Sequence, residues 1–141
     1  MIDKSQYYHG AAIMSLLQDK NLSLTRKGLL GYVVNNKVFA FFKYRTNPRT
    51  PWIFIFDQED VERCSAMNLE YEGVIVGLIC GGDGVCWITW KEASELLDLK
   101  PGRITLRRKH GESYGVFGQV MNLKRKIPVS RWATIISDLK I

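Results

Sequence analysis

Apolar residues gather in short runs separated by turn-forming residues, and the densest of these runs lie between Leu29 and Phe56. The first two runs meet at Asn35-Asn36, and this pair predicts a hairpin because Asn tolerates the positive φ angles of a two-residue turn. β-branched and aromatic residues on both sides favour strands. A third run, Pro51–Phe56, follows a polar and basic loop over residues 43–51. We expect the three runs to form the centre of a sheet.

The same patterning predicts the remaining elements. Strands are expected over residues 21–26, 73–80, 85–90, 103–108 and 113–120, and helices over 4–18, 58–67, 91–97 and a final segment that begins near Ser130. Asp57 is a natural cap for the second helix. Residues 73–80 are almost wholly apolar, which indicates a strand buried on both faces, and the glycine-rich residues 81–84 form its turn.

Helices at both ends of the chain, with strands and shorter helices between them, indicate an α+β fold. We expect residues 1–141 to form a single domain, in which a mixed or mostly antiparallel sheet is packed with N-terminal, interior and C-terminal helices. A chain of 141 residues is long enough to bury a core without disulfides or metals.

Composition and termini indicate a cytoplasmic protein with no membrane association. The N-terminus lacks a basic segment followed by an apolar run, and no stretch of about 18 apolar residues occurs. The three cysteines are an odd number in a chain without an export signal, which favours reduced thiols. With only two histidines, the chain offers weak support for a zinc site. We expect no metal and no cofactor.

Charge is unevenly distributed along the chain. Residues 1–56 carry eight Lys or Arg against two acids, residues 57–99 carry two against ten, and residues 100–141 carry ten against two. If the two basic segments share a face, they would form a cationic surface able to follow a phosphate backbone. The competing interpretation is that the basic segments pair with the acidic segment inside the monomer.

The charge pattern predicts a non-enzymatic module that binds DNA or RNA through a basic surface with aromatic support. Tyrosines beside the arginines would add base stacking or cation–π contacts. The candidate contact residues are Lys43, Tyr44, Arg45, Arg49, Arg103, Arg107, Arg108, Tyr114, Lys124, Arg125 and Lys126. We expect Tyr114 to lie roughly opposite Arg107 in a hairpin.

A metal-dependent nuclease is disfavoured, although the order of elements is similar to that of PD-(D/E)xK nucleases. That chemistry needs an acid two residues before a lysine on one strand, so that the metal and the attacking water share its edge. Phe41 stands at that place before Lys43, and the hairpin turn offers Asn35 and Asn36 instead of acids. A nuclease-like scaffold that lacks the catalytic acids stays a lesser alternative.

Two further alternatives remain open. The four tryptophans and the apolar strands would suit a protein-interaction or inhibitor module, including a homodimer, if part of the apolar surface is exposed. Convergence of His9, Lys43 or an acidic side chain in one pocket would indicate an enzyme instead. No nucleophile or phosphate-binding motif is present, so enzymatic activity is not expected.

Three short pieces of the chain carry a resemblance. They are Phe42-Lys43-Tyr44, then Pro51-Trp52 with Phe54 and Phe56, and finally Leu78-Ile79-Cys80-Gly81 with Asp83-Gly84. Together they resemble a family of small uncharacterised bacterial proteins with this arrangement. The resemblance spans residues 29–90 and implies a compact domain and a bacterial or phage origin, but no activity.

Overall fold

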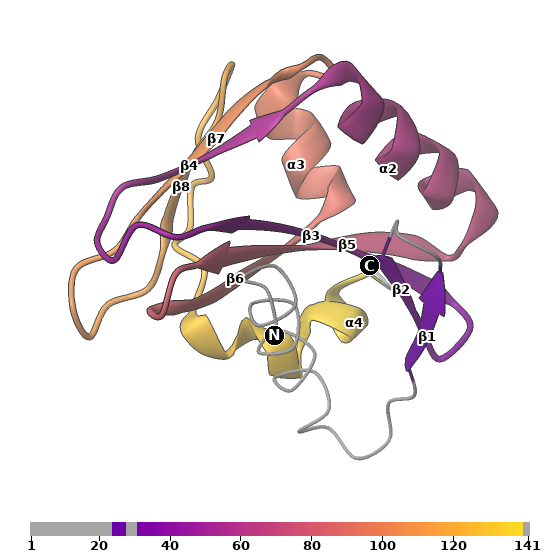
Figure 1. Cartoon of the computed structure of the whole chain (residues 1–141), viewed down its shortest axis with the longest axis horizontal. Helices are drawn as coiled ribbons and strands as arrows, with labels where there is room; N and C mark the ends of the chain where they lie inside the picture. The colour runs from indigo at the N-terminus through magenta and orange to yellow at the C-terminus, as the bar shows by residue number, and fades with distance from the viewer. Residues whose placement is uncertain (1–23, 28–30, 140–141) are drawn as a thin grey trace, which may run out of the picture.

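The computed structural model describes residues 24–27 and 31–139, which form two sheets, α-helices and a 3₁₀ turn (Figure 1). The larger sheet has the order β1 (Leu24–Lys27), β2 (Gly31–Val34), β3 (Val38–Arg45), β5 (Gly73–Cys80), β6 (Gly84–Thr89). The smaller sheet has the order β4 (Trp52–Phe56), β7 (Gly102–Arg107), β8 (Gly115–Phe117). The helical elements are α2 (Gln58–Glu70), α3 (Trp90–Leu97), η1 (Val129–Ala133) and α4 (Ile135–Asp138).

The α+β class is confirmed, and several local predictions hold. The β2–β3 hairpin turns at Asn35 and Asn36, whose φ angles of 53° and 59° lie in the left-handed region. Helix α2 begins after Asp57, whose side chain accepts a hydrogen bond from the backbone N–H of Asp60. All eight residues of β5 are buried, as its apolar composition predicts. The helix expected over residues 4–18 lies outside the described residues.

One prediction about the sheet is wrong. The third apolar run becomes β4, which pairs antiparallel with β7 in the smaller sheet and does not join the β2–β3 hairpin. Strand β5 takes the place beside β3 and runs parallel to it, after α2 has carried the chain back. Apolar side chains alternate across β4, so either sheet would have buried one of its faces.

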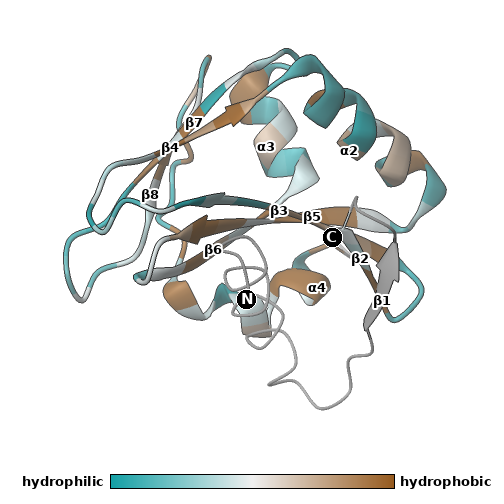
Figure 2. Ribbon diagram, viewed as in Figure 1, coloured by the Kyte–Doolittle hydropathy of each residue, from teal (hydrophilic) through white to brown (hydrophobic). Residues whose placement is uncertain are grey.

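Both faces of the larger sheet are covered, because β5 in its interior is buried along its whole length. On one face, Phe39, Phe41 and Leu78 join a core with residues of α2, α3 and the smaller sheet. On the other face, Phe42 and Trp87 pack with residues of η1 and α4. Figure 1 shows α2 and α3 on one side of the larger sheet and α4 on the other, and Figure 2 shows hydrophobic residues along β5.

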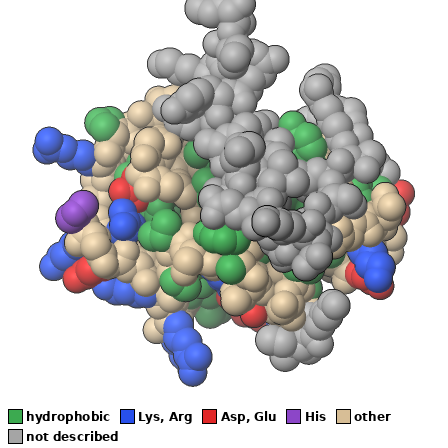
Figure 3. Space-filling model, turned by 90° about the horizontal axis from the view of Figure 1, so that it is seen from below, with side chains coloured by type: hydrophobic (Ala, Val, Ile, Leu, Met, Phe, Trp, Pro, Cys, Tyr) green, Lys and Arg blue, Asp and Glu red, His purple; other side chains and the backbone are tan. Residues whose placement is uncertain are grey.

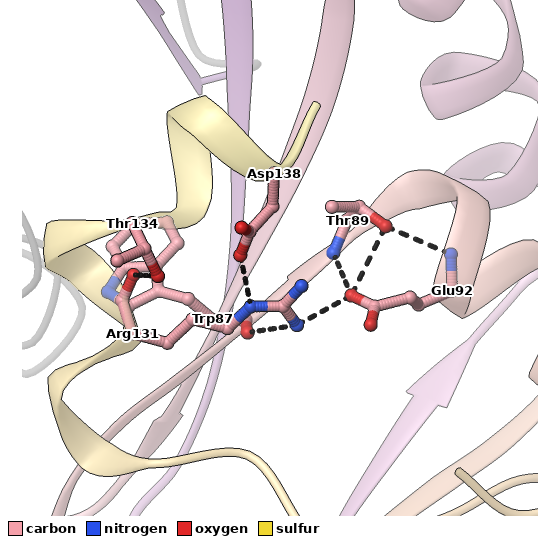
Figure 4. A network of polar contacts seen from close by, with 6 residues as sticks. All are labelled: Trp87, Thr89, Glu92, Arg131, Thr134 and Asp138. Atoms are coloured by element: carbon pink, nitrogen blue, oxygen red, sulfur yellow. Dashed lines mark hydrogen bonds and ion pairs between the residues drawn. The ribbon is translucent and has the colours of Figure 1, made fainter. Parts of the chain in front are cut away.

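The C-terminal segment differs from the single helix that its spacing predicts. It forms the 3₁₀ turn η1 followed by the four-residue α4, and no side chain caps η1, so Ser130 is not its cap. The Arg131 guanidinium donates to Glu92 at 2.7 Å, to Asp138 at 3.0 Å and to the Trp87 carbonyl at 3.3 Å (Figure 4). These contacts join the segment to β6 and α3.

Glycine at position 77 of β5 provides the space for an aromatic pair. The Phe42 and Trp87 rings meet edge to face with their centroids 5.5 Å apart. A Cβ atom added at Gly77 would lie 2.7 Å from the Phe42 ring and 3.0 Å from the Trp87 ring. Both rings are held in a close-packed interior, so neither moves without cost.

We expect Gly77→Ala to lower the free energy of unfolding by about 1–3 kcal/mol, because overpacking displaces buried side chains. Urea denaturation followed by circular dichroism measures the change. Gly82→Ala is the matched control, since a Cβ atom there meets nothing within 4 Å. Equal denaturation midpoints for the two variants would contradict this description of the core.

Candidate nucleic-acid interface

Loops from both sheets meet at one end of the molecule. The β3–β4 loop touches the β5–β6 turn where the Gly81 N–H donates to the Arg45 carbonyl at 2.8 Å. It touches the β7–β8 loop where the Arg108 N–H donates to the Thr50 hydroxyl at 3.2 Å. Asn47 braces the first loop from within through its amide, which donates to the carbonyls of Arg49 and Pro51. The loops therefore hold one another in place.

Asp83, in the β5–β6 turn, anchors this assembly from the inside. Its carboxylate accepts from the Arg108 guanidinium at 2.7 Å and from the Tyr114 hydroxyl at 2.8 Å. The Arg108 Nε donates to the Glu112 carbonyl at 2.7 Å, and its guanidinium carbon lies 5.6 Å from the centroid of the Tyr114 ring. One carboxylate thus ties both ends of the β7–β8 loop to the larger sheet.

The segment after β8 joins the same end of the molecule. Tyr114 and Ile127 exchange backbone hydrogen bonds at 2.8 Å, which places residues 124–126 beside the β7–β8 loop. Lys126 contacts the Glu112 carboxylate at 3.2 Å. The structure therefore brings together the region of the β3–β4 loop and residues 124–126, which lie about eighty positions apart in the sequence. Both segments are predicted as contact clusters.

We call the surface formed by these loops and this segment the basic end. Its exposed cations without a salt bridge to any other described residue are Arg45, Arg49, Arg107, Lys109, Lys124 and Arg125. Figure 3 shows Lys and Arg side chains gathered beside a histidine at one end of the molecule. The acids at this end, Asp83 and Glu112, are both engaged by cations. The basic end therefore carries a local excess of positive charge.

Lys43 is drawn away from the basic end into the interior of the protein. Its ammonium group lies 2.7 Å from an Asp60 carboxylate oxygen on α2 and 5.3 Å from the centroid of the Phe56 ring. Asp60 also accepts a hydrogen bond from the Asp57 N–H at the start of that helix. This pair, together with Arg108–Asp83 and Arg131–Glu92, means that internal pairing with the acidic segment accounts for some of the basic residues.

The predicted aromatic support is only partly available. Tyr114 is fully buried, so its ring does not reach a ligand, and its predicted stacking role is corrected to an internal contact with Asp83. Burial raises the pKa of the Tyr114 hydroxyl well above its usual range, and Cys80 and Asp83 nearby raise it further. Tyr44 is 38% exposed at the end of β3. Arg103 lies at the far end of β7 from Arg107, away from the loops.

The nuclease-like alternative gains no catalytic site within the described residues. Phe41, at the position where an acid would be needed, is buried in the core. The carboxylate that pairs with Lys43 is Asp60, which lies on α2 and not on the same strand as the lysine. No group of three or more His, Cys, Asp or Glu side chains in the described ranges is arranged to hold a metal ion. His9 lies outside the described residues, and His110 is exposed in the β7–β8 loop.

Comparison of the chain with known protein families, curated proteins and solved structures finds no significant match. The resemblance to small bacterial proteins therefore stays a prediction, and the function proposed below rests on this chain's own residues. Within the described ranges, no helix combines the length and apolar composition needed to cross a membrane.

The Asp83–Arg108 ion pair generates a stability prediction. Its side chains are only 23% and 15% exposed, whereas those of Glu112 and Lys126 are 47% and 59% exposed. We expect a double-mutant cycle of alanine substitutions to give a coupling energy of about 1 kcal/mol or more for the first pair. The second pair is expected to give less than about 0.5 kcal/mol, because water screens exposed charges. A larger coupling energy for the exposed pair would contradict the role given to Asp83.

The three cysteines are all buried and free. In the β5–β6 ladder, Cys80 lies opposite Gly84 and Cys86 lies opposite Leu78, so the two cysteines do not face each other. Burial raises the pKa of Cys64 from its usual 9.0 to about 12. We expect native protein at pH 8 to resist a thiol-specific disulfide reagent, and urea-unfolded protein to react at three thiols. Rapid reaction of the native protein would contradict this burial.

The buried thiols also predict how stability depends on pH. In the unfolded chain the thiols ionise near pH 9, whereas in the folded protein burial keeps them protonated at that pH. The free energy of unfolding should therefore fall as the pH rises from about 9 to 12.

Proposed function

We propose that the protein binds the phosphate backbone of a nucleic acid through the basic end. The observation that carries the proposal is the convergence there of exposed cations from both basic segments, without salt bridges to other described residues. A cation already paired with a carboxylate gains less from a phosphate, because the pair must first be broken. The arginines and lysines of the basic end that form no salt bridge with another described residue would release counterions from the nucleic acid directly.

The rigid frame beneath these cations supports the same proposal. The Arg108 backbone N–H donates to the Thr50 hydroxyl, and its guanidinium donates to Asp83. The Trp52 indole N–H donates to the Asn47 carbonyl, so a ligand would not have to order these loops. Loops that are already ordered spare the entropy cost of fixing them on binding. An arginine-rich surface on an ordered frame suits a repeating anion better than a single small ligand.

A charge-neutralisation experiment tests the proposal. We expect Arg49→Gln with Arg107→Gln to weaken binding to a labelled duplex or single strand and to reduce the slope of log K against log salt concentration by about 1.4–1.8, because each of the two phosphate contacts contributes about 0.7–0.9. Fluorescence anisotropy over a range of salt concentrations measures both quantities.

The matched control is Lys37→Gln with Lys91→Gln, which lowers the net charge equally. Both lysines are exposed. Lys37 immediately precedes β3, whose last residue is Arg45, so the two are roughly 25 Å apart at the usual rise of a strand. We expect this variant to keep the wild-type salt dependence. If both double variants lose affinity equally, net charge alone is responsible and the basic end is not the binding site.

A protein-interaction module is the second candidate function. Ile55, Val120 and Met121 are 61%, 61% and 39% exposed on or beside the smaller sheet, and exposed apolar groups favour a protein partner or a second copy of the chain. Sedimentation of the free protein distinguishes the candidates. A dimer that persists at micromolar concentration, with no nucleic-acid binding, would favour this second function.

A further inference from the structure

Within the part of the chain that the structure describes, the outer face of the smaller sheet carries exposed and half-exposed side chains, which are arranged in rows across the strands. Residues of β4, β7 and β8 alternate between a buried inner face, with Trp52, Leu106 and Val116, and an outer face. The pairing register places Ile53, Thr105 and Phe117 in one row of the outer face. Ile55 and Arg103 form the next row, and Arg107 lies opposite Gly115 on the other side.

Phe117 presents a ring that is both exposed and held in position. The side chain is 38% exposed. Its ring leans back along β8 over Gly115, where an added Cβ atom would meet ring carbons at 3.2 and 3.3 Å. Since Gly115 pairs with Arg107, the ring lies toward the basic end of the sheet. The absence of a side chain at position 115 gives the ring a flat backbone surface to rest on.

The charge of this face has one sign. None of the residues of β4, β7 and β8 is acidic, and the charged outer residues are Arg103 and Arg107. Both arginines are exposed and form no salt bridge with another described residue. Apolar and aromatic side chains between two arginines complement a chain of bases joined by phosphates.

We propose that a single-stranded nucleic acid lies across this face, with a base stacked on Phe117 and its phosphates near Arg103 and Arg107. This inference rests on the proposed function and adds the form of the nucleic acid and the place of its bases. Paired bases within a duplex do not offer their planes to a ring on a sheet, whereas unpaired bases do. Arg103, at the end of β7 away from the loops, would contact a phosphate in this arrangement.

The size of the face matches a few stacked bases, and a protein partner would have to extend beyond it, over neighbours such as Val120 and Met121. Two strand spacings and about four residues of strand length give a footprint of about 10 by 13 Å, or about 130 Å². A stable protein interface buries about 800 Å² on each partner. Sheet surfaces that bind single strands stack about two or three bases, which fits the smaller footprint.

The test compares an oligo(dT) of twelve nucleotides, an oligo(U) of the same length and a duplex of twelve base pairs, each fluorescein-labelled. We expect Phe117→Leu to weaken binding of the single strands at least about fivefold, because stacking is lost while an apolar side chain is kept. Binding of the duplex should be unchanged. Leu69→Ala is the control, because Leu69 is 89% exposed on α2, away from the sheet.

Photocrosslinking supplies a readout that a merely structural role of Phe117 would not give. An oligonucleotide with 5-iodouridine should crosslink to Phe117 in the wild type, and mass spectrometry of the peptide that contains β8 locates the bond. A crosslink at Phe117, together with the selective loss of single-strand binding, supports the inference.

The outcomes separate this inference from the proposed function. If the wild type binds no nucleic acid, both fail. If it binds with steep salt dependence but Phe117→Leu binds single strands as tightly as the wild type, the inference alone is overturned. A dimer that Phe117→Leu abolishes would also overturn it, because a second copy would then cover the face.

Discussion

Strand β5 imposes the constraint on which the architecture depends, because all eight of its residues are buried and both faces of the larger sheet must therefore be covered. The smaller sheet, α2 and α3 cover one face, and η1 and α4 cover the other. The smaller sheet on the first face is built from β4, which follows β3 in the chain, and from β7 and β8, which come later. The connections between the sheets meet beside the β5–β6 turn, where Asp83 holds Arg108 and Tyr114.

This arrangement distinguishes two groups among the described cations. Lys43, Arg108 and Arg131 are bonded to carboxylates from the acidic middle of the chain and hold elements together. The remaining cations of the loops stay exposed above that framework. Internal pairing therefore accounts for the first group, and the second group is the one proposed to contact phosphates. The outer face of the smaller sheet adjoins the basic end, because Arg107 belongs to both.

Local signals predicted much of the fold. The asparagine turn, the Asp57 cap and the uninterrupted apolar composition of β5 depend on neighbours in sequence, and each is found where expected. The partner of β4, the burial of Tyr114 and the division of the last helix depend on residues far away in sequence, such as Asp83 and Glu92. Phe117 was missed as a candidate ligand residue. The alternation of Gly115, Val116 and Phe117 places it on the face opposite Val116, but only the folded structure shows that the side chain is exposed there and lies in a row with Thr105 of β7.

The most direct test of the account is a nuclear magnetic resonance titration of the isotopically labelled protein with a short unlabelled oligo(dT). The amide signals of the β3–β4 and β7–β8 loops and of strands β7 and β8 should shift together as the oligonucleotide is added. Signals of the β2–β3 turn, at the opposite end of β3, should stay in place. Shifts centred on that turn or on α2, or no shifts at low salt, would contradict the assignment of the basic end as a nucleic-acid interface.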